Sequence, residues 1–268
     1  MPAKSKPIAV FDSGVGGISV LRELVRLMPN ENYIYFGDSA NAPYGSRSTE
    51  QIRALALQAA ENLFAQGAKA LVVACNTATS VSVRVLRDLY DFPVIGMEPA
   101  LKPAVTGSEG KVLVLATDLT LKQAKFNYLV ETFNAQDRVL KLPMGQLVNF
   151  AEKGDFNSDE LISYIKERFS TIDFSEIDSV VLGCTHFLYF KSILQKLLPP
   201  NIKIYDGNIG TIKHTAKLAG IELLDTPQEI DYSKITFYYS DVLLDKHCAK
   251  LYKFKDSINN YLEEKNNV

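Results

Sequence analysis

Two short stretches of similar design decide the fold of this chain. They are Leu71-Val72-Val73-Ala74-Cys75-Asn76-Thr77 and Val180-Val181-Leu182-Gly183-Cys184-Thr185-His186. Each is an apolar run of strand length that ends in a cysteine and small polar residues, and the pattern predicts a helix after each. The two thiols should therefore lie at the carboxyl ends of parallel strands, where open α/β sheets hold their ligands. A helix N-terminus at that point suits an anion and is expected to lower the pKa of the thiol.

Length and composition favour an ordinary globular protein. The chain has 268 residues, 47% of them hydrophobic, and a net charge of −2. This length favours two domains, and the charge gives no reason to expect nucleic acid or a membrane surface as a partner. The odd count of three cysteines and the lack of a secretory or membrane-spanning run favour a reducing cytoplasm.

Apolar strands and amphipathic helices alternate along the chain. The predicted strands of the first part are Ile8–Phe11, Tyr33–Phe36, Lys69–Ala74 and Pro93–Gly96. The predicted helices are Ile18–Met28, a long helix capped by Ser48 and ended by Gly67, and Thr77–Leu89. This alternation predicts a parallel sheet that is covered on both faces.

A second α/β run begins near Pro99. Its predicted strands are Lys111–Ala116, Val139–Leu142, Ser179–Leu182 and Ile202–Tyr205. Its predicted helices include Thr120–Phe133, Gln146–Glu152, Ser158–Phe169, Tyr189–Leu197 and Ile209–Leu218. The tail contains a strand, Ile235–Tyr239, and then helices to about Glu263. Because this strand needs a sheet edge, we expect it to join the first part of the chain.

Cys75 and Cys184 stand out from an ordinary buried cysteine because each follows a strand and precedes a helix start. His186 lies two residues beyond Cys184, where its imidazole could exchange a proton with the thiol or bind a carboxylate. A capping or solvated histidine is the alternative. Asp12 ends the first strand and could tune a thiol on the neighbouring strand, or simply bind backbone N–H groups.

The remaining cysteine and histidines have no comparable setting. Cys248 is predicted to be a packing residue of a helix, and His214 and His247 are isolated on predicted helices. A metal site is not expected, because Cys75, Cys184 and His186 include no close ligand pair such as C-x-x-C.

Two thiols on opposite sides of a substrate could invert a stereocentre. One would remove a proton from carbon and the other would return a proton to the opposite face, and cysteine's reference pKa of about 8.5 is near enough to neutrality. The charge that develops on an adjacent carboxylate needs preorganised donors. The available donors are Ser13, Gly45, Asn76, Thr77 and Thr185.

A rival interpretation starts from the glycines after the first strand. Gly14-Val15-Gly16, followed by a helix and then by Asp38, is similar to the dinucleotide fingerprint. The third glycine of that motif would fall on Ser19, and the motif leaves the paired cysteines unexplained.

At these residues the chain strongly resembles the glutamate racemases, cofactor-independent enzymes of the aspartate/glutamate racemase superfamily. The motifs that carry the resemblance are Phe11-Asp12-Ser13-Gly14-Val15-Gly16-Gly17, Asn41-Ala42-Pro43-Tyr44-Gly45, Ala74-Cys75-Asn76-Thr77-Ala78-Thr79 and Leu182-Gly183-Cys184-Thr185-His186. The resemblance implies an α/β fold with two similar domains, whose mostly parallel sheets face each other across a central cleft. The expected division is residues 1–97 with 208–268 in one domain and residues 98–207 in the other.

The resemblance also implies roles for individual residues. Cys75 would be the base acting on D-glutamate, supported by Asp12, and Cys184 the base acting on L-glutamate, supported by His186. The implied substrate-binding residues are Asp12, Ser13, Tyr44, Gly45, Asn76, Thr77, Thr120, Glu152, Thr185 and His186. The implied function is supply of D-glutamate for peptidoglycan, and hence for cell wall and cell shape. No cofactor or metal is expected; family members commonly form homodimers.

Three alternatives stay open at this stage. The loop Thr117-Asp118-Leu119-Thr120, with Gln123 after it, and Leu188 depart from the family pattern, so aspartate or another amino acid is an alternative substrate. A nucleotide-binding oxidoreductase would use the glycine loop. A redox sensor would pair Cys75 with Cys184 in a reversible disulfide, which requires Cα atoms within about 7 Å.

Overall fold

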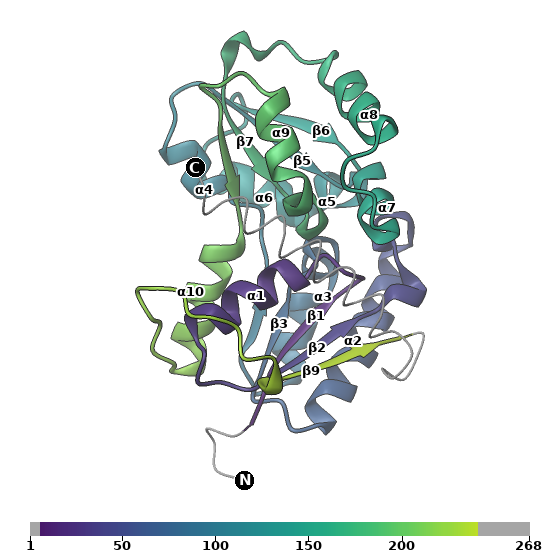
Figure 1. Ribbon diagram of the computed structural model, residues 1–268, viewed down its shortest axis with the longest axis vertical. Helices are drawn as coiled ribbons and strands as arrows, with labels where there is room; N and C mark the ends of the chain where they lie inside the picture. Colours follow the sequence, from purple (N-terminus) through teal and green to yellow (C-terminus); the bar gives the residue numbers. More distant parts are fainter. Residues whose placement is uncertain (1–5, 241–268) are drawn as a thin grey trace.

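The computed structural model describes residues 6–240 and has an α/β fold built on two sheets (Figure 1). The larger sheet has the strand order β4-β3-β1-β2-β9. Its strands are β1 (Ile8–Asp12), β2 (Tyr33–Gly37), β3 (Ala70–Val73), β4 (Val94–Gly96) and β9 (Ile235–Tyr239). Every pairing in it is parallel, which confirms the fold class predicted from the sequence.

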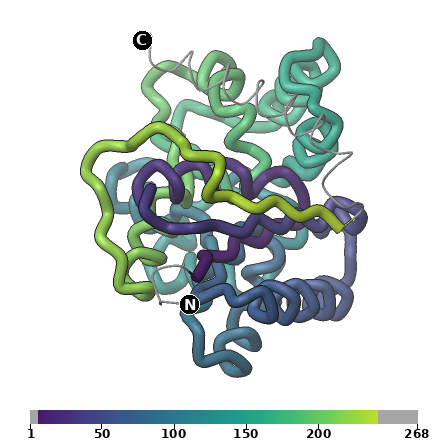
Figure 2. Tube along the Cα trace, turned by 60° about the horizontal axis from the view of Figure 1, so that its bottom comes forward, coloured from purple at the N-terminus to yellow at the C-terminus, as the bar shows by residue number. Residues whose placement is uncertain are grey.

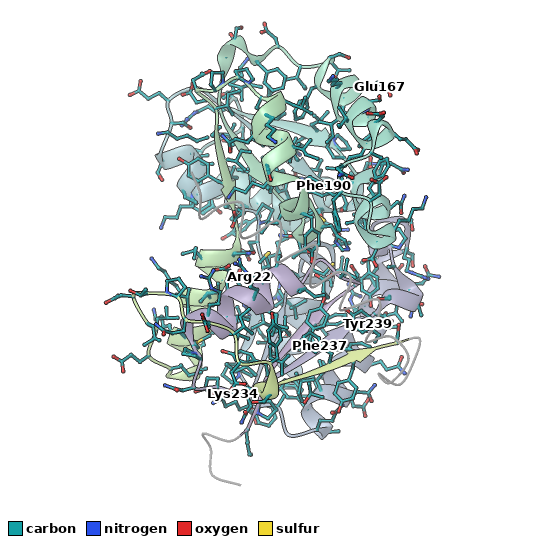
Figure 3. All side chains as sticks on the ribbon, in the orientation of Figure 1. Arg22, Glu167, Phe190, Lys234, Phe237 and Tyr239 are labelled. Atoms are coloured by element: carbon teal, nitrogen blue, oxygen red, sulfur yellow. The ribbon has the colours of Figure 1, made fainter. Side chains whose placement is uncertain are left out.

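The second sheet is also parallel and has the order β6-β5-β7-β8. Its strands are β5 (Lys111–Ala116), β6 (Val139–Pro143), β7 (Ile177–Leu182) and β8 (Lys203–Asp206). We refer below to the residues around the five-stranded sheet as the first half and to those around the four-stranded sheet as the second half. Side chains of both halves meet between the two sheets (Figure 3).

Helices cover both faces of each sheet. In the first half they are α1 (Ile18–Leu27), α2 (Thr49–Ala65), α3 (Asn76–Leu89) and α10 (Asn208–Ala219). In the second half they are α4 (Leu101–Thr106), α5 (Asp118–Lys122), α6 (Ala124–Thr132), α7 (Gln146–Lys153), α8 (Asp159–Phe169) and α9 (Lys191–Leu197). Short 3-10 helices span Ser39–Asn41, Tyr44–Ser46, Phe174–Glu176, Thr185–Phe190 and Tyr232–Lys234. None of the helices in residues 6–240 combines the length and apolar character that crossing a membrane requires.

Strand β1 shows why both faces of the sheet must be covered. All five of its residues are buried. Ala9 and Phe11 pack into the cluster under α2 and α3, and Ile8 and Val10 pack into the opposite cluster with α1 and α10. A strand buried on both faces is a near-continuous apolar run, which is the pattern that marked it in the sequence.

The C-terminal strand returns to the first half, as predicted. β9 pairs in parallel with β2, from Tyr33 opposite Ile235 to Gly37 opposite Tyr239. Figure 2 shows this yellow-green segment beside the purple N-terminal part of the chain. The helices predicted after it, with His247 and Cys248, lie outside the described residues.

The chain passes between the halves twice, and the two crossings lie against each other. Met97 and Glu98 lead out of the first half, and Gly207 leads back. A Cβ atom on Gly207 would lie 2.7 Å from the carbonyl oxygen of Glu98, so only glycine allows this approach. The backbone N–H of Met97 also donates to the carbonyl of Val73 at the end of β3.

Two predicted helices differ from the structure. The stretch from Thr120 to Phe133 is not one helix, because Gln123 adopts an extended ψ of 142° and separates α5 from α6. The helix predicted from Tyr189 begins as an α-helix only at Lys191. Before it, Thr185–Phe190 forms a 3-10 helix, in which the N–H of Phe187 donates to the carbonyl of Cys184. Apolar spacing does not separate these tighter turns from an α-helix.

Candidate active site

The two cysteines lie at the carboxyl ends of β3 and β7, where the sequence placed them. Cys75 is the N-cap of α3, and its Sγ accepts a hydrogen bond from the N–H of Ala78 at 3.4 Å. Cys184 follows β7 and precedes the 3-10 helix. Both are buried, with 6% and 7% of their surface exposed, and both are free thiols. No disulfide between them is therefore present.

The expectation that Cys75 has a lowered pKa is wrong. Burial, and after it the neighbouring negative charge of Asp12, raise this pKa to about 12. Hydrogen bonds from Ser13 and from the N–H of Ala78 act in the opposite direction but are outweighed. Without a ligand, Cys75 is therefore a thiol at neutral pH.

Asp12 is fully buried at the end of β1 and connects the two halves. Its Oδ1 accepts from the N–H of Gly14 at 3.1 Å, and its Oδ2 accepts from the hydroxyl of Thr185 at 3.0 Å. Burial raises the pKa of Asp12 to about 6, even though His186 and these two donors favour the carboxylate. Asp12 is thus a carboxyl group that titrates close to neutrality beside Cys75.

The elevated pKa of Asp12 predicts a specific dependence of stability on pH. Between pH 3.8 and about 6 the folded protein keeps a proton that the unfolded chain has released. This contribution to the free energy of unfolding is complete below pH 3.8, falls as pH rises through this window, and amounts to about 3 kcal/mol. Asp12→Asn should remove this fall. Urea denaturation of both proteins should show the variant gaining about 2–3 kcal/mol over the parent between pH 4 and pH 7.5. If the free energies of unfolding of the parent and of Asp12→Asn changed equally with pH, the elevated pKa of Asp12 would be contradicted.

His186 links Cys184 to Glu152. Its Nδ1 lies 3.8 Å from the sulfur of Cys184, and its Nε2 lies 2.6 Å from Oε1 of Glu152. Burial by itself lowers the pKa of His186, but the hydrogen bonds to Cys184 and Glu152 outweigh it and hold the pKa well above the usual 6.5. His186 is therefore an imidazolium at neutral pH, and both of its ring nitrogens can donate.

The glycine loop of the first half lies directly against these groups. A Cβ on Gly14 would lie 1.8 Å from Oε1 of Glu152, and a Cβ on Gly16 would lie 2.4 Å from the Thr185 hydroxyl and 2.5 Å from Nδ1 of His186. These separations are far below van der Waals contact. Glycine at both positions is therefore what allows the two halves to meet at this point.

Three threonine hydroxyls form a buried cluster between the halves. Thr77 of α3 lies 3.1 Å from both Thr117 and Thr120, which lie 2.9 Å apart, measured between the Oγ1 atoms. Gly45 is adjacent, because a Cβ there would lie 3.2 Å from the Cβ of Thr117. The cluster offers several hydroxyl donors at one point, which suits a carboxylate.

The other predicted site residues have different surroundings. Tyr44 is buried, and its hydroxyl donates to Oδ2 of Asp38 at 2.6 Å, so it is already engaged. Asn76 is 5% exposed, and its Oδ1 has no partner although it is buried. Its Nδ2 donates to the carbonyl of Met97 at 3.5 Å. An unpaired buried acceptor is costly unless a ligand donates to it.

Sequence reasoning missed Thr117 and Asp38 as members of the site. Thr117 directly follows β5, so it occupies the same strand-end position as Cys75 and Cys184, and that shared position was the signal available. The sequence offers Asp38 only as the acidic residue of a dinucleotide fingerprint. In the structure it accepts hydrogen bonds from Tyr44 and from Nδ2 of Asn41 instead.

The dinucleotide interpretation does not fit this geometry. The place where a pyrophosphate would approach the glycine loop holds the carboxylate of Glu152, whose Oε1 accepts from the N–H of Val15 at 2.9 Å. A bound anion and this carboxylate would repel each other.

Comparison with known proteins places the chain in a family. Residues 8–215 match the family model of the Asp/Glu/Hydantoin racemases. The chain is 50% identical over 212 residues to the glutamate racemase of Halothermothrix orenii, covering 79% of this chain and 84% of the relative. It is also 50% identical over 216 residues to the glutamate racemase of Bifidobacterium adolescentis, covering 79% and 84%.

Solved structures of glutamate racemases are also similar to this chain. Escherichia coli glutamate racemase, in complex with L-glutamate and the activator UDP-MurNAc-Ala, superposes with a TM-score of 0.80 at 30% identity, covering 96% of this chain and 95% of that one. Francisella tularensis glutamate racemase, in complex with D-glutamate, gives a TM-score of 0.76 at 28% identity, covering 97% and 94%. The chain therefore belongs to the Asp/Glu/Hydantoin racemase family, and within it to the glutamate racemases.

Proposed function

We propose that this protein interconverts L- and D-glutamate without a cofactor, using Cys75 and Cys184 as its two bases. The observation that carries the proposal is the pair of buried, free thiols at the ends of β3 and β7, each beside its own ionisable partner. Each relative and solved structure described above is a glutamate racemase, and two of these structures contain glutamate.

In the proposed reaction the proton crosses the substrate from one sulfur to the other. With D-glutamate, the Cys75 thiolate takes the α-proton, and the electron pair left on carbon receives a proton from the Cys184 thiol on the opposite face. The product is L-glutamate, with Cys75 now a thiol and Cys184 a thiolate. The reverse direction exchanges the two roles, so atoms and charge balance in both directions.

Each sulfur needs a different means of becoming a thiolate. For Cys75, the charge of Asp12 is a main reason why the thiol pKa is high. The α-ammonium group of glutamate bound near Asp12 would offset that charge and favour the thiolate. For Cys184, the protonated ring of His186 supplies an N–H and a positive charge at 3.8 Å, and Glu152 holds the other side of the ring. Asp12 and His186 are thus proposed partners of the two bases.

The carboxylates of the substrate need donors that are already in place. We assign these to the hydroxyls of Thr77, Thr117 and Thr120 together with Gly45, and to Ser13, Tyr44, Asn76 and Thr185 around the two thiols. Tyr44 and Thr185 would contribute through their backbone N–H groups, because their hydroxyls donate to Asp38 and Asp12. The buried threonine cluster supports this assignment, because it presents three hydroxyls within 3.1 Å of one another. Fixed donors of this kind stabilise charge that builds up as the α-proton leaves.

Removal of one hydroxyl from the threonine cluster should weaken substrate binding. Thr117→Val keeps the side-chain shape and should raise the KM for glutamate about tenfold, because loss of one hydrogen bond to a charged group costs about 1.5–3 kcal/mol. Thr117→Ser keeps the hydroxyl and is the matched control, with KM close to the parent. Initial rates at varied L-glutamate, followed by circular dichroism, would measure both. Equal KM values for the valine and serine variants would remove Thr117 from the binding site.

The wider biological assignment follows from the activity. We propose that the enzyme supplies D-glutamate for peptidoglycan in the cytoplasm, where its thiols stay reduced, and that it forms a homodimer. We also propose that residues 1–97 with 208–268 and residues 98–207 are its two domains, since the described strands of the two sheets divide along these lines.

One experiment tests the proposed activity directly. Purified protein without added cofactor is incubated with L-glutamate in deuterated water, and optical rotation and α-deuterium content are followed together. We expect loss of rotation and one solvent deuterium in each D-glutamate formed. L-aspartate and other L-amino acids tested in parallel establish the substrate. Racemisation of none of them, or of aspartate in preference to glutamate, would overturn the proposal.

A further inference from the structure

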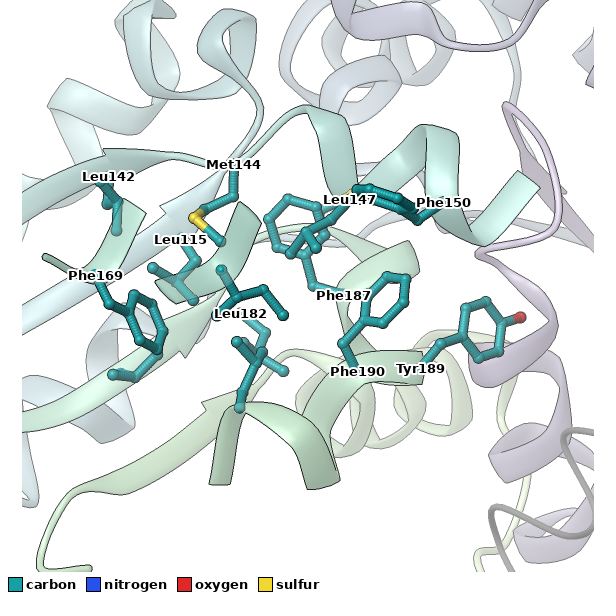
Figure 4. Packing of buried hydrophobic residues seen from close by; sticks show 14 of the residues in the cluster. Leu115, Leu142, Met144, Leu147, Phe150, Phe169, Leu182, Phe187, Tyr189 and Phe190 are labelled. Atoms are coloured by element: carbon teal, nitrogen blue, oxygen red, sulfur yellow. The ribbon is translucent and has the colours of Figure 1, made fainter. Parts of the chain in front are cut away.

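Val15, in the glycine loop of the first half, is held from both sides by the second half. Its N–H donates to Oε1 of Glu152 at 2.9 Å, and its carbonyl accepts from the hydroxyl of Tyr189 at 2.6 Å. Its side chain is 7% exposed and belongs to the hydrophobic cluster of the second half. Figure 4 shows Tyr189 at the edge of that cluster, with its hydroxyl directed towards the purple N-terminal segment. The loop is thus anchored in the half to which it does not belong.

The Tyr189 hydroxyl is a dependable donor at this contact. Tyr189 is 5% exposed, and burial, together with nearby Tyr239, Asp12 and Glu152, holds its pKa well above the usual value of about 10. The group therefore stays protonated. Its ring packs against Phe156, with centroids 5.4 Å apart, which fixes the direction in which the hydroxyl points.

The hydrogen bond between Tyr189 and Val15 connects the residues that support the two proposed bases, Asp12 and His186. On one side of Val15 the chain leads through Gly14 to Asp12, whose charge acts on Cys75. On the other side Glu152 leads through His186 to Cys184. Tyr189 lies three residues beyond His186 in the same 3-10 helix, so its bond to Val15 ties the loop to the element that carries His186. A shift of the glycine loop relative to the 3-10 helix Thr185–Phe190 would therefore displace Asp12 and His186 relative to each other.

We propose that Tyr189 is a positioning residue that keeps the two bases in register by clamping the carbonyl of Val15. This inference rests on the proposed racemase function and concerns proton delivery rather than substrate binding. A loop flanked by Gly14 and Gly16 can rotate its peptide groups easily. Tyr35 fixes the preceding carbonyl from within the first half, by donating to Gly14 at 2.5 Å. Tyr189 supplies the corresponding fixation from the second half.

Misalignment of the two bases would change where deuterium from the solvent appears in the substrate and the product. When both bases are aligned, the carbon that has lost its proton is reprotonated promptly from the opposite face. When the second base is misplaced, this step slows, and the first thiol has time to exchange its proton with solvent and return deuterium to the same face. Recovered substrate then carries deuterium without having been inverted. A variant that merely contained fewer folded molecules would show equal losses of exchange without inversion and of racemisation, and the ratio of the two would stay unchanged.

The experiment compares Tyr189→Phe with Tyr33→Phe in deuterated water. Tyr33 is also a buried phenol; it donates to the carbonyls of Leu24 and Met28, at 3.0 and 2.8 Å, away from the site. Tyr189→Phe removes a donor from one carbonyl and Tyr33→Phe removes a donor shared by two, so the stability loss of the control should be at least as large. The quantity measured is deuterium in remaining L-glutamate divided by deuterium in D-glutamate formed, at low conversion.

We expect Tyr189→Phe to raise this ratio at least threefold and to lower kcat about tenfold, with KM changed less than twofold. Tyr33→Phe should leave the ratio at the parent value. An unchanged ratio in Tyr189→Phe, with kcat falling only as far as in Tyr33→Phe, would overturn the positioning role. Absence of racemisation in the parent protein would instead overturn the proposed function, so the two failures are distinguishable.

Discussion

Cys75→Ala and Cys184→Ala should each reduce glutamate racemisation by about 10⁴-fold or more, because either change removes one of the two groups that must carry a proton. The loss should appear in both directions, since the reaction in each direction uses both sulfurs. The double variant should be about as inactive as either single one, because groups that act as a unit do not contribute additively. Initial rates by circular dichroism, with L- and with D-glutamate, are the measurement.

Each variant should keep a different partial activity. Cys75→Ala retains Cys184, the proposed base for L-glutamate, and should exchange the α-proton of L-glutamate with deuterium slowly while leaving D-glutamate untouched. Cys184→Ala should show the opposite preference. Cys248→Ala, at the third cysteine of the sequence, controls for loss of a thiol and should racemise at the parent rate. Full turnover by either of the first two variants would end the two-base mechanism.

Gly16→Ala should have the second largest effect, because the new methyl group has no room. It would lie 2.4 Å from the Thr185 hydroxyl and 2.5 Å from Nδ1 of His186. We expect activity to fall about 100-fold as these two side chains are displaced, and the free energy of unfolding to fall by about 1–3 kcal/mol. Gly16 has no positive φ, so the effect comes from contact rather than from backbone strain.

Gly210→Ala is the matched control for this glycine replacement. Gly210 lies within α10, and a Cβ there would meet no atom within 4 Å. Alanine is the better helix former, so this variant should be more stable by about 0.5–1 kcal/mol, with parent activity. Urea denaturation and initial rates would measure both variants. Wild-type activity in Gly16→Ala would mean that the halves do not meet at the glycine loop in the working enzyme.

Local sequence signals were sufficient for much of the fold. Ser48 was predicted as an N-cap, and in the structure it forms a full capping box with Gln51 at the start of α2. Gly67 was predicted to end that helix, and it has a φ of +85°. Both features depend on a few neighbouring residues, and residues close in sequence determine them regardless of the tertiary environment.

The site was predicted only in outline, because its properties depend on contacts distant in sequence. The strand ends showed where Cys75 and Cys184 would lie. The sequence did not show that burial would outweigh the helix N-terminus and raise the pKa of Cys75 to about 12. Nor did it show that Val15 would enter the core of the second half, 174 residues from Tyr189. Glu152 was expected from the resemblance alone, and the structure places it against His186.

The two adjoining crossings restrict how the molecule can open. With Gly207 pressed against the backbone of Glu98, both connections lie close to one line, and rotation about that line is the simplest motion that breaks neither. Such a rotation would change the separation of the two sulfurs by an amount that grows with their distance from the line. The same rotation would then both admit the substrate and set the distance that a proton must cross between the two sulfurs.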